Sequence, residues 1–322
     1  MGSWRKTCLL SVLLLLVVVA YGYSQPPPVE REHFIYYLDN PNYLNLADTL
    51  LNRTRRQLID MLRDSLPYKP AVHLVNTQDR FTKLVGGYFP DWGAAAAAPP
   101  RKLIAVKSPD HFNLNKSLRE LLAHEYSHLA LAERTKLCDP PRWFDEGLAQ
   151  LVSMEWSWSD NLAMSKAAIT GQLIPLREIE NLNRFNRGEA HVAYAESYLT
   201  VNYLFDEYGP DAVNTFLDQI AACKSVDEAL MAATGSDYDG FQAEIQAMLV
   251  ERFNVVSLLM DTYFLWIGLA IVVVIGFVIQ HRRRKKYYRD WEEREKYEST
   301  DFDYGDPDDP ERLDDEDEPW RR

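Results

Sequence analysis

Two histidines and a glutamate lie within five residues of one apolar segment, 121-LLAHEYSHLAL-131. On an α-helix, residues four apart share one face, so His124 and His128 can direct two imidazoles at one point, as a zinc ion requires. Glu125 lies beside the first histidine, where its carboxylate can reach a water at that point and act as general base. Without a cation, burying this carboxylate would cost free energy. The segment therefore predicts a zinc site with His124 and His128 as ligands and Glu125 as catalytic base.

A third ligand is expected from a following helix, because catalytic zinc keeps three protein ligands and one open position. The segment 143-WFDEGLAQ-150 offers Glu146, and Gly147 beside it has no side chain, which lets two helices approach closely. A buried carboxylate in this apolar segment needs a cation, which the metal would supply. We predict Glu146 as the third ligand, with Asp145 and then Asp139 as alternatives.

HEYSH together with WFDEGLA resembles the gluzincin metallopeptidases, specifically the proteins with a peptidase MA-like domain. The resemblance covers roughly residues 30–250, and its specific motifs lie in residues 120–150 and 190–210. It implies a zincin-like fold, Zn²⁺ as cofactor and a peptide or protein as substrate. The residues that it implies are His124, His128 and Glu146 as zinc ligands and Glu125 as the group that activates water.

The segment 192-VAYAESYLTVNYLFDEYG-209 resembles the helix of aminopeptidase-like gluzincins whose tyrosine hydroxyl stabilises the oxyanion. Tyr194 occupies that place, and a phenol suits the role because it donates a hydrogen bond where negative charge develops. Tyr198 and His191 are the alternatives, and Tyr194 as a mere packing residue also stays open. The sequence lacks the amine-anchoring GxMEN-like motif of the aminopeptidases, so it does not distinguish an endopeptidase from an exopeptidase.

The elements that would position these residues fall into two halves. Strand character, with β-branched, aromatic and apolar residues, is found over residues 33–38, 71–75 and 101–107. The run AAAAAPP at 94–100 indicates an extended segment or loop. Helical spacing is found over residues 44–66, 115–132, 142–154, 165–170, 189–208, 211–222, 226–234 and 238–253. Strands followed by helices predict an α+β, zincin-like fold, with a small N-terminal sheet and a mainly helical half.

Two details of these elements affect the site. Ser117 and Glu120 match a capping box for the helix that carries the histidines, and Asn113 or Asn115 is the expected N-cap. An extended substrate is expected to pair with a sheet edge beside this helix, for which residues 101–107 are the candidate.

Both ends of the chain carry membrane signals. Residues 1–24 are typical of a secretory signal peptide, because Arg5 and Lys6 precede an apolar run that ends near the small residues Gly22 and Ser24. Residues 262–280 form a charge-free apolar run that is long enough to cross a bilayer, and HRRRKK follows it directly. By the positive-inside rule the basic end is cytoplasmic, so residues 25–258 would be the exported metallopeptidase domain.

Residues 281–322 are predicted to be a basic juxtamembrane segment and an acidic, disordered cytoplasmic tail. The tail serves either as a solvated segment or as a docking peptide for a cytoplasmic partner. The net charge is −13 at pH 7, and acidic side chains are also in excess in the exported region, which disfavours nucleic acid as a partner. Cys138 and Cys223 lie in the exported region and are candidates for a disulfide, which the sequence alone does not decide.

These features together predict a single-pass membrane protein with a periplasmic or otherwise extracytoplasmic N-terminal domain. The expected function is zinc-dependent hydrolysis of peptide bonds on the exported side, by a zinc-water mechanism with Glu125 as general base. The alternative is a membrane-tethered binding or assembly factor whose zinc site is structural or vestigial.

Overall fold

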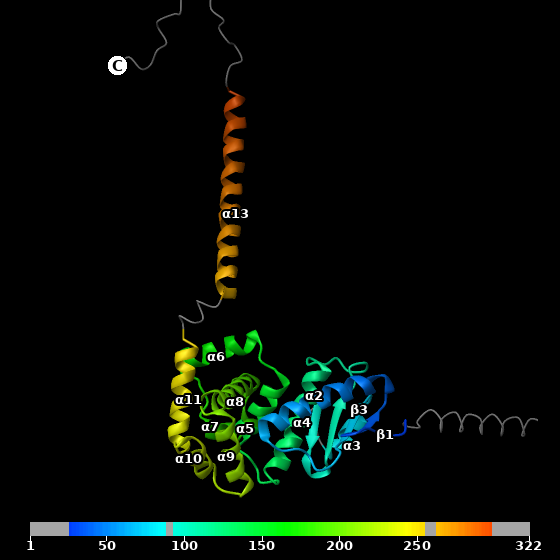
Figure 1. Cartoon of the computed structure of the whole chain (residues 1–322). Helices are drawn as coiled ribbons and strands as arrows, with labels where there is room; N and C mark the ends of the chain where they lie inside the picture. The colour runs from blue at the N-terminus through cyan, green and yellow to red at the C-terminus, as the bar shows by residue number, and fades with distance from the viewer. Residues whose placement is uncertain (1–25, 88–92, 255–261, 298–322) are drawn as a thin grey trace, which may run out of the picture. The chain divides into compact units, whose positions relative to one another are not determined.

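The structure is a computed structural model that describes residues 26–87, 93–254 and 262–297 (Figure 1). The predicted signal peptide and residues 298–322 of the predicted tail lie outside the described residues. The chain divides into two compact units, Met1–Leu258 and Leu259–Arg322, and each is described by itself.

The first unit contains a sheet followed by helices, which confirms the predicted α+β fold (Figure 1). Its strands are β1 (Val29–Glu30), β2 (Ile35–Leu38), β3 (Ala71–Val75), β4 (Ala95–Ala98) and β5 (Leu103–Lys107). Its α-helices are α2 (Leu44–Leu62), α3 (Gln78–Val85), α4 (Leu118–Arg134), α5 (Arg142–Ser153), α6 (Trp158–Thr170), α7 (Leu176–Ile179), α8 (Arg187–Glu207), α9 (Gly209–Ala221), α10 (Val226–Thr234) and α11 (Tyr238–Arg252). Short 3-10 turns occupy Pro41–Tyr43, Pro99–Arg101 and Leu182–Arg184.

The five strands form one mixed sheet in the order β1-β2-β3-β5-β4. β2, β3 and β5 run parallel, and β1 and β4 pair antiparallel at the two edges. β5 is buried along its whole length, as expected for a central strand covered on both faces. The prediction that residues 101–107 form the sheet edge beside α4, the helix that carries both histidines, was therefore wrong. That edge is β4, the alanine run, which lies against α4.

The helix that carries both histidines begins at a capping box. The Ser117 hydroxyl accepts a hydrogen bond from the Glu120 amide, and the Glu120 carboxylate accepts one from the Ser117 amide at 2.6 Å. Ser117 is therefore the N-cap of α4, and the expected Asn113 and Asn115 are not. This reciprocal pairing satisfies two N–H groups at the helix end and fixes where α4 starts.

Several helices differ from the sequence-based boundaries. α3 and α7 were not predicted, and α6 begins seven residues before the predicted 165–170 segment. α3 is short and amphipathic, with Phe81 as its one buried residue, so eight residues gave too little periodicity to recognise. The other helices lie within a few residues of their predicted positions.

α5 and α8 approach each other closely at Gly147. A Cβ atom on this residue would lie 2.2 Å from the Ser197 carbonyl oxygen and 2.7 Å from Val201 Cγ2, closer than any real packing allows. The structure thus confirms the expectation that Gly147 brings two helices together. Its neighbour Glu146 is thereby held in the interior between α4, α5 and α8.

An aromatic cluster packs around the first turn of α5. Trp143 lies 5.7 Å from Phe144 and 6.0 Å from both Phe216 and Phe241, measured between ring centroids. All four side chains are fully buried. Burying each such ring stabilises the fold by about 1.5–3 kcal/mol, so α5 has little freedom to move.

Glu196 on α8 is a buried acid that faces away from solvent. It is 1% exposed, and its carboxylate accepts hydrogen bonds from the Ile174 amide at 2.9 and 3.2 Å. Burial raises its pKa from 4.5 to about 8, although the Ile174 amide lowers it. The folded protein therefore holds a proton that the unfolded chain releases near pH 4.5.

We expect this proton to make the stability depend on pH. A raised carboxyl pKa stabilises the fold below about pH 4.5, and this contribution is lost as pH rises to about 8. Unfolding in urea at pH 5 and pH 8 measures the loss, and Glu196→Gln, which is neutral throughout, is expected to remove this component. An unchanged pH dependence in that variant would contradict the assignment.

Cys138 and Cys223 are joined by a disulfide with a Cα–Cα distance of 5.6 Å. It links the loop between α4 and α5 to the turn between α9 and α10. The loop that connects the two ligand-bearing helices is thus held at one point to the C-terminal helices.

The second unit contains one long helix, α13 (Thr262–Glu295). It is long and apolar enough to cross a membrane by length and composition. The helix continues beyond the predicted span 262–280 through the basic segment that follows it.

Candidate metal centre and catalytic site

The structure brings three of the predicted site residues together. The candidate ligand atoms of His124, His128 and Glu146 all lie within 4.8 Å of one another. His124 Nε2 lies 3.6 Å from a Glu146 carboxylate oxygen, and the two imidazole ring centres are 4.9 Å apart. α4 supplies the histidines from one face, and α5 supplies the glutamate.

A carboxylate contacts the far nitrogen of each imidazole. His124 Nδ1 lies 3.0 Å from a Glu155 oxygen, and His128 Nδ1 lies 2.6 Å from an Asp145 oxygen. Such contacts orient the rings and leave each Nε2 free to face the cluster. Asp145, the first alternative ligand, therefore lies behind His128, and Asp139 is an exposed residue outside the cluster.

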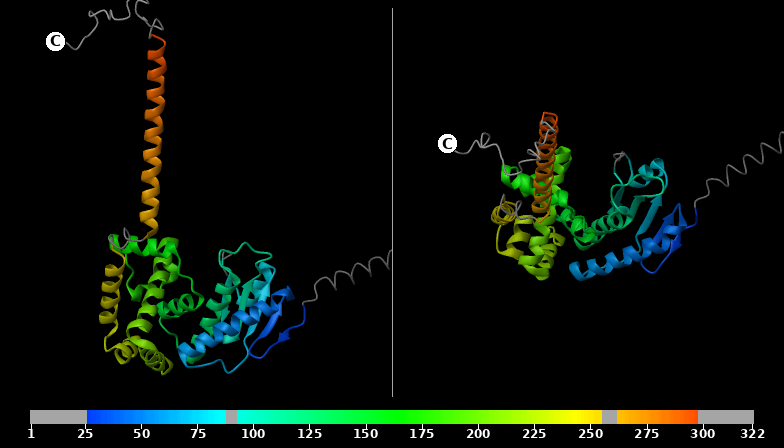
Figure 2. Two further views of the ribbon diagram at one scale, coloured as in Figure 1. Left: turned by 45° about the horizontal axis from the view of Figure 1, so that its top comes forward. Right: turned by 90° about the horizontal axis from the view of Figure 1, so that it is seen from above.

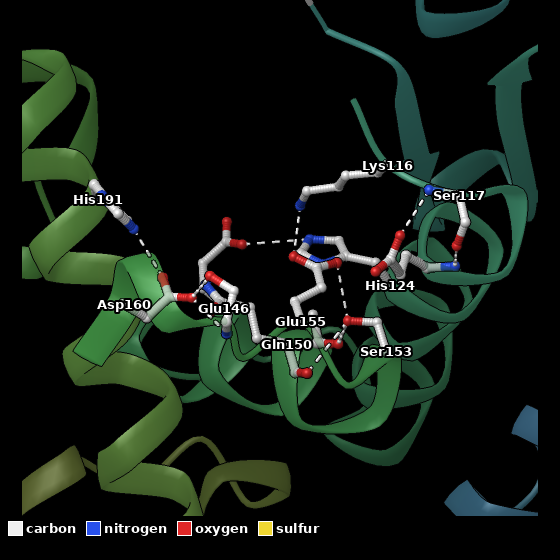
Figure 3. Close-up of polar contacts among 12 residues, drawn as sticks. Lys116, Ser117, His124, Glu146, Gln150, Ser153, Glu155, Asp160 and His191 are labelled. Carbon is white, nitrogen blue, oxygen red and sulfur yellow. Dashed lines mark hydrogen bonds and ion pairs between the residues drawn. The ribbon is translucent and has the colours of Figure 1, made fainter. Parts of the chain in front are cut away.

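Glu155 is itself held in place by several partners, as Figure 3 shows. The Ser153 hydroxyl donates a hydrogen bond to it at 2.9 Å, and Lys116 forms an ion pair with it at 2.5 Å. Its side chain is 9% exposed, so these contacts, together with His124, satisfy a buried charge.

The electrostatics of the cluster favour positive charge. Burial lowers the pKa of His124, but hydrogen bonds with Glu146 and Glu155 outweigh it and raise the pKa to about 10. For His128, burial is likewise outweighed, mainly by Asp145, and the pKa rises to about 9. The surrounding carboxylates thus stabilise about two positive charges, which either two imidazole protons or one divalent ion can supply.

The donor set fits zinc. Two imidazole nitrogens and one carboxylate oxygen are the ligands of a His₂Glu catalytic zinc site, and here they converge from two helices. The carboxylates of Glu155 and Asp145, which contact the Nδ1 atoms of His124 and His128, fix the imidazole orientation that such a site needs. The cluster also faces open space, because all three residues line a cleft of about 590 Å³.

Glu125 lies in the same cleft, beside the cluster. It is 8% exposed, and the Ala97 amide of β4 donates a hydrogen bond to its carboxylate. Burial raises the pKa of Glu125 above its ordinary value, against the lowering effect of the two imidazoles. Its carboxylate is therefore more basic than an exposed one, which suits a proton acceptor.

Tyr194, the residue proposed from the sequence to stabilise the oxyanion, lines the same cleft. Burial raises the pKa of its hydroxyl to about 12, with a further rise from Glu146, so the phenol stays protonated at neutral pH. Arg142 hydrogen-bonds with Tyr194 and forms an ion pair with Glu146 at 2.7 Å. One guanidinium thus connects the phenol to the candidate ligand.

The two alternatives to Tyr194 have other partners. Tyr198 stacks on Trp156, with ring centres 4.8 Å apart. His191 contacts an Asp160 carboxylate at 2.7 Å and lies apart from the three clustered residues (Figure 3). Of the three candidates, only Tyr194 lines the cleft.

Four contributors were not identified from the sequence: Glu155, Lys116, Arg142 and Ala97. Arg142 lies four residues before Glu146, so the helical spacing would have placed both on one face. Glu155 follows the end of α5 and reaches His124 through the tertiary fold, and no local pattern indicates this. Ala97 contributes its backbone amide, which a sequence pattern does not reveal.

Comparison with protein families identifies a match that includes the site. The model of the peptidase MA superfamily matches residues 75–251, from β3 to the last turn of α11, and so includes the whole cluster. A search of the curated proteins finds no match. With two histidines one helical turn apart, a glutamate from the next helix and this match over more than half of its length, the chain belongs to the peptidase MA superfamily.

Proposed function

We propose that the protein is a membrane-anchored zinc peptidase that hydrolyses peptide bonds on the exported side of the membrane. The observation that carries this proposal is the convergence of His124, His128 and Glu146, with Glu125 beside them in one cleft. When bound, zinc supplies Lewis acidity to a carbonyl oxygen and to water.

Glu125 acts as general base in this proposal. Its buried carboxylate takes a proton from the attacking water and later passes it to the leaving amine. The amide of Ala97 orients the carboxylate toward the cleft. The raised pKa of Glu125 makes its carboxylate a stronger acceptor for the proton of water.

Tyr194 stabilises the charge that develops on the carbonyl oxygen. The phenol is protonated at neutral pH and faces the cleft, so it can donate a hydrogen bond to an oxyanion. Arg142 positions this phenol and holds Glu146, because its guanidinium contacts both side chains.

β4 is the strand along which an extended substrate would lie. It pairs with β5 on one side only, and Ala94 to Ala97 line the cleft. Backbone groups on a strand edge without a neighbouring strand bind an extended polypeptide by strand addition, and on β4 these would be the groups other than the Ala97 amide, which Glu125 occupies.

Two features support the proposed membrane topology: the apolar helix α13 and the disulfide. The apolar part of α13 would span the membrane with the basic residues after Gln280 on the cytoplasmic side. The first unit would then be exported, and the disulfide between Cys138 and Cys223 supports this because such bonds persist in oxidising compartments.

Metal analysis of the purified full chain tests the proposal. We expect about one zinc per chain, loss of that zinc in His128→Ala, and peptidase activity that a chelator removes and added zinc restores. His33→Ala changes a histidine that lies just before β2 and outside the cluster, so this variant is the matched control and should retain zinc. Zinc retained in His128→Ala would contradict the proposed centre.

The carboxylates behind the histidines are expected to strengthen zinc binding. Glu155→Gln and Asp145→Asn should each weaken zinc affinity by about 10–100-fold, because they remove a charged partner of an imidazole. Competition with a chromophoric chelator measures the affinity. Asp139→Asn removes an exposed acid and serves as control. Equal affinities in all three variants would show that these contacts do not support the metal.

A further inference from the structure

The exposed face of α6 carries large apolar side chains on a single stripe. Trp158, Leu162 and Ile169 are 46%, 41% and 46% exposed, and Lys166 is exposed between them. At 100° per residue these four positions fall within a sector of about 80°. The opposite side of the helix packs inward through Met164 and Ala167. We call this stripe the α6 face.

α6 lies beside the end of the domain from which the chain continues to α13. Figures 1 and 2 show α6 next to the C-terminal end of α11. Trp156, just before α6, contacts Phe253, just after α11, with ring centres 6.4 Å apart. The α6 face and the last residues of the first unit are therefore at the same end of the domain.

The connection to α13 is short. Eight steps along the chain separate Asn254 from Thr262, which a fully extended chain spans in at most about 29 Å. A domain on such a connector stays near the bilayer that its own helix crosses. Its effective concentration at the lipid surface is then high enough for a small apolar face to bind.

We propose that the α6 face docks onto the lipid surface of the membrane that α13 spans. The chemistry suits an interface: an indole, two aliphatic side chains and a lysine, in a domain that is otherwise rich in acids. Tryptophan prefers the headgroup region, aliphatic side chains enter the acyl boundary, and lysine contacts anionic headgroups. The occupant of this face is therefore lipid.

Docking also determines which substrates reach the cleft, an inference that rests on the proposed peptidase function. Glu155, which contacts His124, lies only three residues before Trp158, so their Cα atoms are at most about 11 Å apart. With α6 on the bilayer, the cleft stays close to the membrane surface. The substrates would be polypeptide segments that emerge next to that surface.

Fluorescence quenching in nanodiscs tests the docking in the full chain. Leu162→Cys places a reactive thiol on the α6 face. It is the single free thiol when Cys8 is also replaced by serine, because Cys138 and Cys223 form a disulfide. The thiol is labelled with an environment-sensitive dye, and lipids that carry a shallow spin label are the quencher. We expect at least about twofold quenching at position 162.

Two matched controls make the test specific. Leu46→Cys on α2 replaces a leucine that is 48% exposed, against 41% for Leu162, and its label should not be quenched. Ile169→Asp, added to Leu162→Cys, should remove the quenching, whereas Met231→Asp on α10 should not. Met231 is 50% exposed, and α10 lies at the other end of the helical half from α6 (Figure 1).

Equal quenching at positions 162 and 46, or no effect of Ile169→Asp, would overturn the proposal. A blue-shifted emission at position 162 without lipid quenching would also overturn it, since a protein would then cover the face. None of these readouts involves catalysis. Carbonate extraction of the same chain reports insertion of α13 separately, so a failed anchor is distinguished from an anchored domain that does not dock.

Discussion

Glu125→Gln is expected to reduce kcat/KM by about 10²–10⁴-fold while leaving the zinc content unchanged. The amide has nearly the shape of the carboxylate but cannot take the proton from water. Zinc should stay because Glu125 is not among the three clustered ligand residues. Hydrolysis of a fluorogenic peptide by the purified full chain gives the rate, and metal analysis of the same sample gives the zinc content.

A matched substitution on the same helix separates chemistry from folding. Glu133→Gln changes a partly exposed glutamate eight residues further along α4 and should leave both the rate and the zinc content unchanged. Full activity of Glu125→Gln, with contaminating peptidases excluded, would contradict the assigned base. Loss of zinc from Glu125→Gln would instead mean that this carboxylate supports the metal directly.

Gly147→Ala is expected to destabilise the first unit by about 3 kcal/mol and to lower Tm by roughly 6–12 °C. The new methyl carbon would lie 2.2 Å from a backbone oxygen and 2.6 Å from a backbone carbon, both of Ser197. Backbone atoms cannot rotate away as a side chain can, so α5 and α8 must move apart. Calorimetry or a circular dichroism melt measures the change.

The same substitution should weaken zinc binding. Glu146 directly precedes Gly147, so a shift of α5 carries its carboxylate away from the two imidazoles. Gly188→Ala in the first turn of α8 is the control, because its Cβ would meet only the Asn186 side-chain oxygen, at 3.4 Å. A Gly147→Ala variant as stable as the control would show that the helices tolerate a wider separation.

The metal cluster was predictable because its determinants are local. His124 and His128 are one helical turn apart, and Glu146 adjoins the one glycine that permits close packing of α5 and α8. Helical geometry alone therefore fixed the relative placement of two of the three ligands. Asp145 was predicted as an alternative ligand because sequence does not show which of two adjacent acids points inward.

The surrounding support could not be predicted in the same way. Glu155 reaches His124 across 31 residues, and Lys116 reaches Glu155 across 39. Such contacts depend on how α4, α5 and the loop after α5 pack. The edge strand was misassigned for a related reason. The residue pattern of β5 indicates a strand, but it does not show that β3, which lies before α3 in the sequence, pairs on one side of β5 and that β4, which directly precedes it, pairs on the other.

β4 has one more property with consequences for selectivity. Every side chain from Ala95 to Ala98 is a methyl group, and this strand forms one wall of the cleft. Methyl groups carry no charge and form no deep side-chain pocket, so this strand does not distinguish one substrate side chain from another. A polypeptide held along it would be held by its main chain, whatever its composition. Choice among polypeptides would then fall to the side chains on the rest of the cleft, such as Leu114, Lys116 and Arg142.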